Sequence, residues 1–308
     1  MEKNILILGH KNPDTDSICS AMVKQRLNEK NGKKNSKAIR IGKINKETEY
    51  VLNYLNIEKP ELVEEIKEGQ EVILVDHNEF NQSINGIEKA KIIGVVDHHR
   101  IANIETSEPL YMTIRPYGST STLLYQDFKE KGLEISREEA VLMASAIISD
   151  TLLLKSPTTT KKDVDALKEL SKIGNIDANQ YGLEMLKAGT DLDEFSEKEL
   201  INIDSKLLEK NDTKFIIAQV NTVSIEDVLK RQEGIENVID KEIEEKGLSL
   251  FVLAITDILN SNTEIIVLGN KSVAVEKAFD INLENNRAFL KGVVSRKKQI
   301  LPNIDKNI

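Results

Sequence analysis

Acidic and imidazole side chains gather directly after three short apolar runs of the sequence. The runs cover residues 5–8, 71–75 and 91–96, and each has the length and aliphatic content of a strand buried on both faces. Imidazoles and carboxylates together suit a divalent metal ion of intermediate hardness. The side chains that follow these runs belong to His10, Asp14, Asp16, Asp76, His77, Asp97, His98 and His99.

The loop after the first run carries its own turn signal. The Asn12-Pro13 pair predicts that the loop folds back, so that His10 and Asp14 converge on one ion while Asp16 faces a second. A plainer interpretation is a polar loop in which Asp16 or Ser17 caps the next helix.

The distribution of the histidines favours the metal interpretation. All four histidines of the chain lie at these strand ends beside an aspartate, which core packing does not explain. We therefore expect a dinuclear metal centre, with Asp97 as an acceptor that fixes the tautomer of a ligating imidazole and His99 as a donor to substrate. The end of the buried helix predicted at 136–148 delivers one more acid, Asp150. The candidate metal ligands are therefore His10, Asp14, Asp16, Asp76, His98 and Asp150.

Helical patterns alternate with the predicted strands in the first part of the chain. This alternation predicts a parallel sheet with right-handed crossovers, which brings the carboxyl ends of the strands to one edge. Capping boxes at residues 136–139 and 160–163 predict two of the helix starts. We expect strands at 5–8, 38–41, 71–75, 91–96 and 110–114, and helices at 17–29, 48–55, 118–128, 136–148, 160 onwards and 176–188.

The last third of the chain predicts a second, smaller α/β domain. Residues 190–195 lack apolar periodicity and are the predicted linker between domain 1–189 and domain 196–308. A pair of strands joined near Asn262-Thr263 predicts an antiparallel hairpin and hence a mixed sheet. The active site is expected in the cleft between the domains. The expected elements are strands at 215–220, 248–256, 264–268 and 288–294 and one helix at 224–245.

Basic residues of this second domain are candidates for anion binding. Arg296, Lys297 and Lys298 continue the last predicted strand, so they should point to alternate faces and turn one or two charges into a cleft. The alternative is a solvated strand end. Lys206 is a weaker signal, because it lies among Lys198 and Lys210 on a stretch that looks helical.

The composition of the chain limits the kinds of partner and substrate that it can bind. The net charge of −9 and an aromatic content of 4% disfavour a nucleic-acid track, although a small anionic substrate fits a site lined by metals and local cations. No apolar run has the length of a membrane span, and the N-terminal stretch does not read as a signal peptide. With a single cysteine, Cys19, we expect a cytoplasmic protein.

The triplet Asp97-His98-His99 resembles the signature of the DHH phosphoesterase superfamily. Four further motifs narrow the resemblance to the family II inorganic pyrophosphatases, which depend on manganese or cobalt. Length, order and spacing match over essentially the whole chain, and no regulatory insertion interrupts residues 101–121. The motifs are GHKNPDTDS at 9–17, VDHNE at 75–79, SDT at 149–151 and SRKKQ at 295–299.

The resemblance implies a role for each matching residue. His10 and Asp14 would hold one metal ion, Asp16, His98 and Asp150 the second, and Asp76 would bridge the two ions. The phosphates would be bound by His99, Lys206, Arg296 and Lys297, among which Lys206 matches only by its place after the linker. The candidate catalytic residues are therefore His99, Asp97, Lys206, Arg296 and Lys297, and the role of Lys298 stays open.

The activity implied by the resemblance is hydrolysis of pyrophosphate to two phosphates. A hydroxide shared by two Mn²⁺ or Co²⁺ ions per subunit would attack one phosphorus, with His99 as general acid, Mg²⁺ carried by the substrate and the two domains closing around it. The family is typically a homodimer joined through the first domain. The alternatives are another DHH phosphoesterase, acting on short oligonucleotides, cyclic dinucleotides or polyphosphate, and a sensor that binds metal or phosphate without turnover.

Overall fold

The computed structural model describes residues 4–33, 35–190, 192, 195–211 and 213–308, without the side chain of Lys297. The chain forms two compact units, Met1–Gly189 and Thr190–Ile308. Half of the predicted linker, residues 191, 193 and 194, lies outside the described residues. None of the helices in the described part of the chain has both the length and the apolar character for crossing a membrane.

A six-stranded sheet organises the first unit, in the order β3-β2-β1-β4-β5-β6. Every pair of neighbouring strands runs parallel, which confirms the predicted parallel sheet. The strands are β1 (Ile5–Leu8), β2 (Ser36–Arg40), β3 (Glu61–Leu62), β4 (Glu71–Val75), β5 (Lys91–Asp97) and β6 (Tyr111–Ile114). The carboxyl ends of β1, β4 and β5, adjacent in the sheet, therefore lie side by side.

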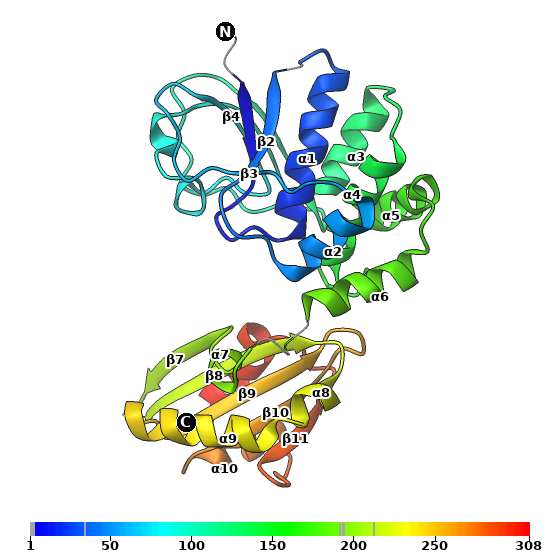
Figure 1. Ribbon diagram of the computed structural model, residues 1–308. Helices are drawn as coiled ribbons and strands as arrows, with labels where there is room; N and C mark the ends of the chain where they lie inside the picture. The colour runs from blue at the N-terminus through cyan, green and yellow to red at the C-terminus, as the bar shows by residue number, and fades with distance from the viewer. Residues whose placement is uncertain (1–3, 34, 191, 193–194, 212) are drawn as a thin grey trace. The chain divides into compact units, whose positions relative to one another are not determined.

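Helix α4 is the buried helix of this unit. Its apolar body is enclosed because α4 packs against α1, α3, α5 and α6, and Figure 1 shows α1, α3, α4 and α5 side by side. Capping boxes begin α4 and α5 where the sequence predicts them. The helices are α1 (Thr15–Lys30), α2 (Lys46–Leu55), α3 (Thr120–Glu130), α4 (Arg137–Thr151), α5 (Lys161–Gly174) and α6 (Ala178–Gly189), with 3₁₀ turns at Phe80–Gln82 and Ile87–Lys89.

The second unit is built on a five-stranded sheet in the order β11-β10-β9-β8-β7. Only β8 and β9 pair in parallel, so the sheet is mixed, as predicted. The strands are β7 (Ser205–Lys210), β8 (Thr213–Thr222), β9 (Leu250–Asp257), β10 (Asn262–Leu268) and β11 (Arg287–Lys291).

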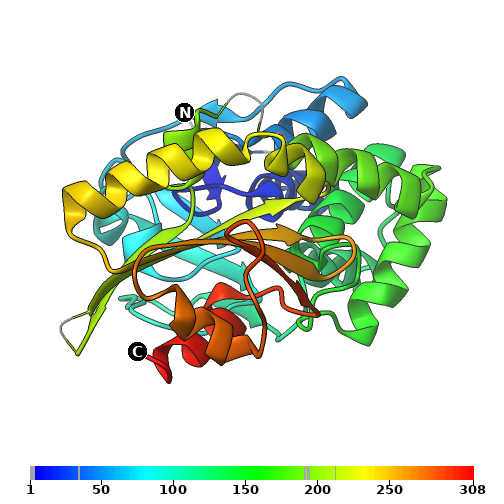
Figure 2. The ribbon, with the colours of Figure 1, turned by 90° about the horizontal axis from the view of Figure 1, so that it is seen from below.

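Helices cover both faces of this second sheet. Ile235 and Ile239 pack with Phe251 on one face, whereas Val275 and Ile304 pack with the other. Figure 2 shows α9 in yellow on one side and the helices in orange to red on the other. The helices are α7 (Glu197–Leu200), α8 (Ile225–Leu229), α9 (Gln232–Lys246), α10 (Ser272–Phe279) and α11 (Leu301–Asp305).

Two predictions in this unit are wrong because long-range contacts decide the backbone. The helix expected at 224–245 is divided into α8 and α9. Between them, the guanidinium of Arg231 donates to the Leu192 carbonyl at 2.9 Å and to Glu197 at 3.1 Å. Lys206 lies on the strand β7 rather than on a helix, because β7 pairs antiparallel with β8.

The basic triplet also departs from its predicted strand. Strand β11 ends at Lys291, and residues Arg296–Ile300 form one turn of π-helix. The Gln299 side chain accepts hydrogen bonds from the backbone N–H of Val294 and of Ser295, while the Ser295 hydroxyl caps the turn by accepting from the N–H of Lys298. These local bonds turn the chain out of extended conformation, so the expected alternation of faces does not apply.

Candidate metal centre

The loop after β1 is held tightly against the start of α1. An added Cβ on Gly9 would lie 1.8 Å from the Ser17 hydroxyl, so only glycine fits there. The N–H of His10 donates to that hydroxyl at 3.1 Å, and the N–H of Ser17 donates to Asp14 at 2.9 Å. Asp14 is therefore the N-cap of α1, and neither Asp16 nor Ser17 caps that helix.

Asp76 occupies the middle of the cluster. It follows β4 in a left-handed conformation with φ of 61°, and its side chain is buried. Its Oδ2 lies 3.5 Å from Nε2 of His10, and its Oδ1 lies 3.3 Å from Nε2 of His98. Thr120 donates to Oδ1 at 3.1 Å, but Oδ2 has no hydrogen-bond partner. A buried carboxylate oxygen without a donor fits a site that receives a cation.

Asp16 and Asp150 approach the same imidazole from two helices. Both lie with Asp76 and His98 in one group whose potential ligand atoms are within 4.8 Å of one another. Oδ2 of Asp150, near the end of α4, lies 3.4 Å from Nε2 of His98. Asp16 is fixed by the N–H groups of Thr120 at 2.6 Å and Ser121 at 3.2 Å, at the start of α3.

Three ligand groups thus share Asp76 as a common member. Among the described residues they are His10 with Asp14 and Asp76; Asp16 with Asp76, His98 and Asp150; and Asp76 with His98 and His99. Mixed nitrogen and oxygen donors of this kind match the ligand preference of Mn²⁺. All six predicted metal ligands are brought together, and the donor set fits two ions that share one carboxylate.

The histidine rings are oriented by acceptors behind them. Nδ1 of His98 lies 3.0 Å from the carbonyl of Tyr117, which leaves Nε2 facing Asp76 and Asp150. Nδ1 of His99 lies 2.9 Å from Oδ1 of Asp97, which also accepts from the N–H groups of His98 and His99. Asp97 therefore orients His99, whereas a backbone carbonyl orients His98.

Without metal, the carboxylates and imidazoles of the cluster shift one another's pKa values. Burial lowers the pKa of His10, but the attraction of the neighbouring Asp14 and Asp76 carboxylates outweighs burial and raises that pKa to about 10. Burial also lowers the pKa of His98, but the interactions with Asp76 and Asp16 outweigh burial and raise that pKa to about 9.

Burial and mutual repulsion favour the neutral form of two carboxyl groups in the cluster. Burial and then the charge of Asp76 raise the pKa of Asp16 to about 6, and burial with Asp16 and Asp76 raises the pKa of Asp150 well above its ordinary range. Such crowded acids favour a bound cation.

His77 lies apart from the ligand groups. It is buried, its Nδ1 lies 3.0 Å from the carbonyl of Val75, and burial lowers its pKa. Its position beside Asp76 in sequence therefore does not make it a member of any of the described ligand groups.

Two residues of this unit that sequence reasoning missed support the ligand loops. Asn78 donates to Oδ2 of Asp97 at 2.6 Å and to the carbonyl of Arg100 at 2.8 Å, and it accepts from the N–H of Ala102. Glu47 accepts from the hydroxyls of Thr15 and Ser149. Asn78 lies within the motif VDHNE at 75–79, whereas Glu47 lies outside every ligand motif and had no sequence signal.

In the second unit, Arg296 contacts the pair of strands that carries Lys206. The guanidinium of Arg296 binds Asp204 at 2.8 Å and the Ile217 carbonyl at 3.3 Å, and Ile217 pairs with Lys206 across β7 and β8. Lys206 and Lys298 are exposed, and the side chain of Lys297 lies outside the described part of the chain. Asp204 had not been singled out from the sequence.

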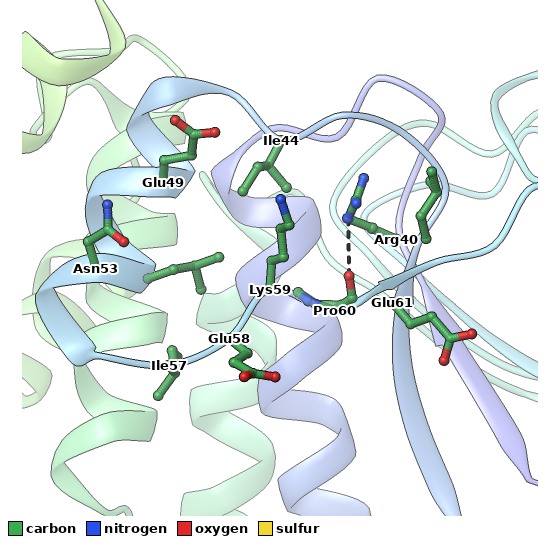
Figure 3. A pocket seen from close by; sticks show the side chains of 11 residues that line it. Arg40, Ile44, Glu49, Asn53, Ile57, Glu58, Lys59, Pro60 and Glu61 are labelled. Carbon is green, nitrogen blue, oxygen red and sulfur yellow. Dashed lines mark hydrogen bonds between the residues drawn. The ribbon is translucent and has the colours of Figure 1, made fainter.

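A separate pocket of about 570 Å³ lies between α2 and the segment before β3 (Figure 3). It is lined on α2 by Glu49 and Asn53 and opposite by Lys59 and Pro60. Arg40 donates to the Pro60 carbonyl at 3.0 Å and to the Gly42 carbonyl at 2.6 Å, so backbone acceptors already engage this cation. The pocket shares no residue with the ligand groups.

Two family models match the chain. The DHH family N-terminal domain matches residues 4–147, and the DHHA2 domain matches residues 183–307. Together with the parallel sheet and the imidazole–carboxylate cluster, these matches define a two-domain protein of the DHH class.

Proteins that are similar over the full length of the chain show which family within this class it belongs to. The chain is 54% identical over 303 residues to the manganese-dependent inorganic pyrophosphatase of Bacillus subtilis (strain 168), covering 98% of this chain and 97% of that protein. A Brevibacillus brevis protein assigned the same activity is 53% identical with the same coverage. A crystal structure from Methanococcus jannaschii, assigned to the family II inorganic pyrophosphatases, is 38% identical with a TM-score of 0.67 and 98% coverage of both chains.

The chain therefore belongs to the manganese-dependent, or family II, inorganic pyrophosphatases, which confirms the resemblance seen in its motifs. An exopolyphosphatase-related protein from Bacteroides fragilis, 14% identical with a TM-score of 0.52, covers 99% of this chain and 92% of its own and shares the fold alone.

Proposed function

We propose that this protein hydrolyses inorganic pyrophosphate to two phosphates at a dinuclear manganese centre in its first unit. The position of Asp76 carries the proposal, because its two oxygens face the two imidazoles His10 and His98 at 3.5 and 3.3 Å. One carboxylate between two nitrogen donors is the arrangement that a shared ligand of two ions needs. Membership of a family of manganese-dependent pyrophosphatases supports the same reaction.

Two of the three ligand groups support the roles that the family resemblance implies. His10 and Asp14 would hold one ion, Asp16, His98 and Asp150 the other, and Asp76 both. When bound, the ions supply a water of lowered pKa at neutral pH and offset the charge of the substrate.

His99 is suited to donate a hydrogen bond or a proton to a phosphate. The hydrogen bond to Asp97 raises the pKa of His99, and its side chain is 52% exposed, so a substrate can reach it. With Asp97 ionised, the Nδ1 of His99 carries a proton toward Asp97, and the Nε2 of the imidazolium carries the second proton outward. Asp97 thereby holds both the tautomer and the direction of the ring.

Arg296, Lys206 and Lys297 are proposed as the phosphate-binding cations. Arg296 offers a planar fork, which Asp204 orients, and the lysines offer point charges. Phosphoryl transfer depends on positioning and on charge stabilisation, which such cations provide.

Four finer features stay predictions from the family resemblance. They are Co²⁺ as an alternative to Mn²⁺, two ions per subunit with a further Mg²⁺ carried by the substrate, a homodimer joined through the first unit, and a cytoplasmic location. Sedimentation of the metal-loaded protein tests the homodimer. Metal analysis of protein isolated from its cells tests the identity and the number of the ions.

Phosphate release by metal-stripped protein resupplied with Mn²⁺ or Mg²⁺ tests the proposed reaction. Pyrophosphate should be hydrolysed fastest, and Mn²⁺ should activate best. Tripolyphosphate, a short oligonucleotide and a cyclic dinucleotide are run beside it. Preferred cleavage of one of these would move the protein to another DHH phosphoesterase activity, and tight phosphate binding without any turnover would make it a sensor.

A further inference from the structure

Glu47, in the first turn of α2, reaches into the ligand-bearing part of the first unit. Its Oε1 accepts a hydrogen bond from the Thr15 hydroxyl at 2.6 Å and another from the Ser149 hydroxyl. Thr15 lies between Asp14 and Asp16, and Ser149 directly precedes Asp150. One carboxylate oxygen therefore ties the loop at Thr15 to the end of α4 at Ser149, which lies 102 residues beyond Glu47 in the sequence.

The helix carrying Glu47 is itself fixed against the same loop. Asn45 caps α2 by accepting from the N–H of Thr48 at 2.7 Å, and the Thr48 hydroxyl lies 3.2 Å from that of Thr15. Both Thr15 and Thr48 are buried. The first turn of α2 thus touches Thr15 through two side chains, and the position of Glu47 is well determined.

The third neighbour of Glu47 is the end of α6. A Cβ added to Gly189 would lie 2.9 Å from Cβ and 3.1 Å from Oε2 of Glu47, so no larger residue fits while Glu47 keeps its place. Burial raises the pKa of Glu47, and the two hydroxyl donors only partly offset this. A carboxylate in such surroundings is costly unless its hydrogen bonds are needed.

We propose that Glu47 is a positioning residue of the metal centre, which sets the distance between the loop of Asp14 and Asp16 and the end of α4 at Asp150. It contacts neither metal nor substrate in this role, and acts by accepting from Thr15 and Ser149. Groups one layer behind metal ligands commonly set metal affinity, since they orient the ligands. The inference rests on the proposed dinuclear centre and adds a determinant of its affinity.

Manganese binding to metal-stripped protein, followed by the electron paramagnetic resonance of free Mn²⁺, tests the proposal. Glu47→Ala should weaken binding about tenfold or more. Glu47→Gln should keep most of the affinity, because an amide oxygen still accepts both hydroxyl bonds. Glu49→Ala is the matched control: Glu49 lies on the same helix but faces the pocket of Figure 3.

Two outcomes would overturn the proposal. Equal affinities of Glu47→Ala, Glu49→Ala and wild type would show that Glu47 does not position the ligands. A loss in Glu47→Gln as large as in Glu47→Ala would show that charge matters and hydroxyl acceptance does not. If wild type itself binds no Mn²⁺, the proposed function fails, which is a distinct result.

Ser149→Ala gives a second route that does not disturb α2. It removes one donor to Glu47 and should weaken Mn²⁺ binding less than Glu47→Ala does. Added to Glu47→Ala, it should have no further effect, because both changes break the same contact. Fully additive losses contradict the proposal. Thermal unfolding of each variant, measured alongside, separates a loss of affinity from a loss of folded protein.

Discussion

The Nδ2 amide of Asn78 donates to Oδ2 of Asp97 at 2.6 Å, and both side chains are buried. The opposite oxygen of Asp97 accepts from His99. Hydrogen bonds from His99 and Asn78 outweigh the effect of burial and lower the pKa of Asp97. His99 and Asn78 together therefore favour the ionised form of the carboxylate that orients a proposed substrate ligand.

Replacing Asn78 by Ala should lower kcat/KM for pyrophosphate about 10- to 100-fold, as expected for losing a hydrogen bond to a charged group. The loss arises because Asp97 is left with one buried oxygen unpaired and the segment up to Ala102 loses two backbone contacts. Steady-state kinetics check this. Asn53→Ala, at an exposed position on α2, is the control, and equal kinetics for both variants would contradict the expectation.

Replacing Asp76 by Ala should abolish the shared ligand. We expect turnover to fall about a hundredfold or more, together with loss of Mn²⁺ from both proposed positions, because every ligand group includes Asp76. Metal content after dialysis and phosphate release measure the two effects. Asp240→Ala, on the exposed side of α9, should change neither. Near-normal turnover of Asp76→Ala with full metal occupancy would rule out the bridging role.

Metal binding should release protons at pH 7. The pKa values of His10 and His98 without metal are about 10 and about 9, so both imidazoles are protonated at pH 7 and must lose a proton to ligate. Binding should release at least these two protons, with a further contribution from Asp150, whose pKa is also raised, and the Mn²⁺ affinity should rise as pH rises toward the imidazole pKa values. Calorimetric titrations in two buffers of different ionisation enthalpy count the protons. Identical heats in both buffers would contradict the prediction.

Replacing Arg296 by Lys should raise KM for pyrophosphate about tenfold while the charge is kept. Lysine cannot reproduce the fork that binds Asp204 and the Ile217 carbonyl, so the cation loses its orientation. Lys298→Ala, at an exposed neighbour in the same π-helical turn, should leave KM near the wild-type value. A KM of Arg296→Lys equal to wild type would show that charge alone suffices.

Much of the first unit could be predicted from the sequence because its signals are local. Buried aliphatic runs of strand length indicated β1, β4 and β5, whose polar ends supply five of the six clustered ligands, while the end of α4 supplies Asp150. Parallel pairing then required that those ends meet at one edge. Capping boxes at Ser136 and Thr160 are contacts between residues three apart, so they too could be recognised.

Only the tertiary structure decided the residues whose surroundings come from distant segments. Pairing with β8 placed Lys206 on a strand, and Arg231 reaches the Leu192 carbonyl 39 positions earlier where α8 ends. At the start of the π-helical turn, the N–H of Arg296 donates to the Gln219 side chain, 77 positions earlier. The supporting roles of Asn78 and Glu47 also depend on partners brought close by the fold. Residue types and their spacing indicated the chemistry of the site. The groups that orient its ligands could be identified only in the folded structure, because hydrogen bonds between distant segments leave no periodic pattern in the sequence.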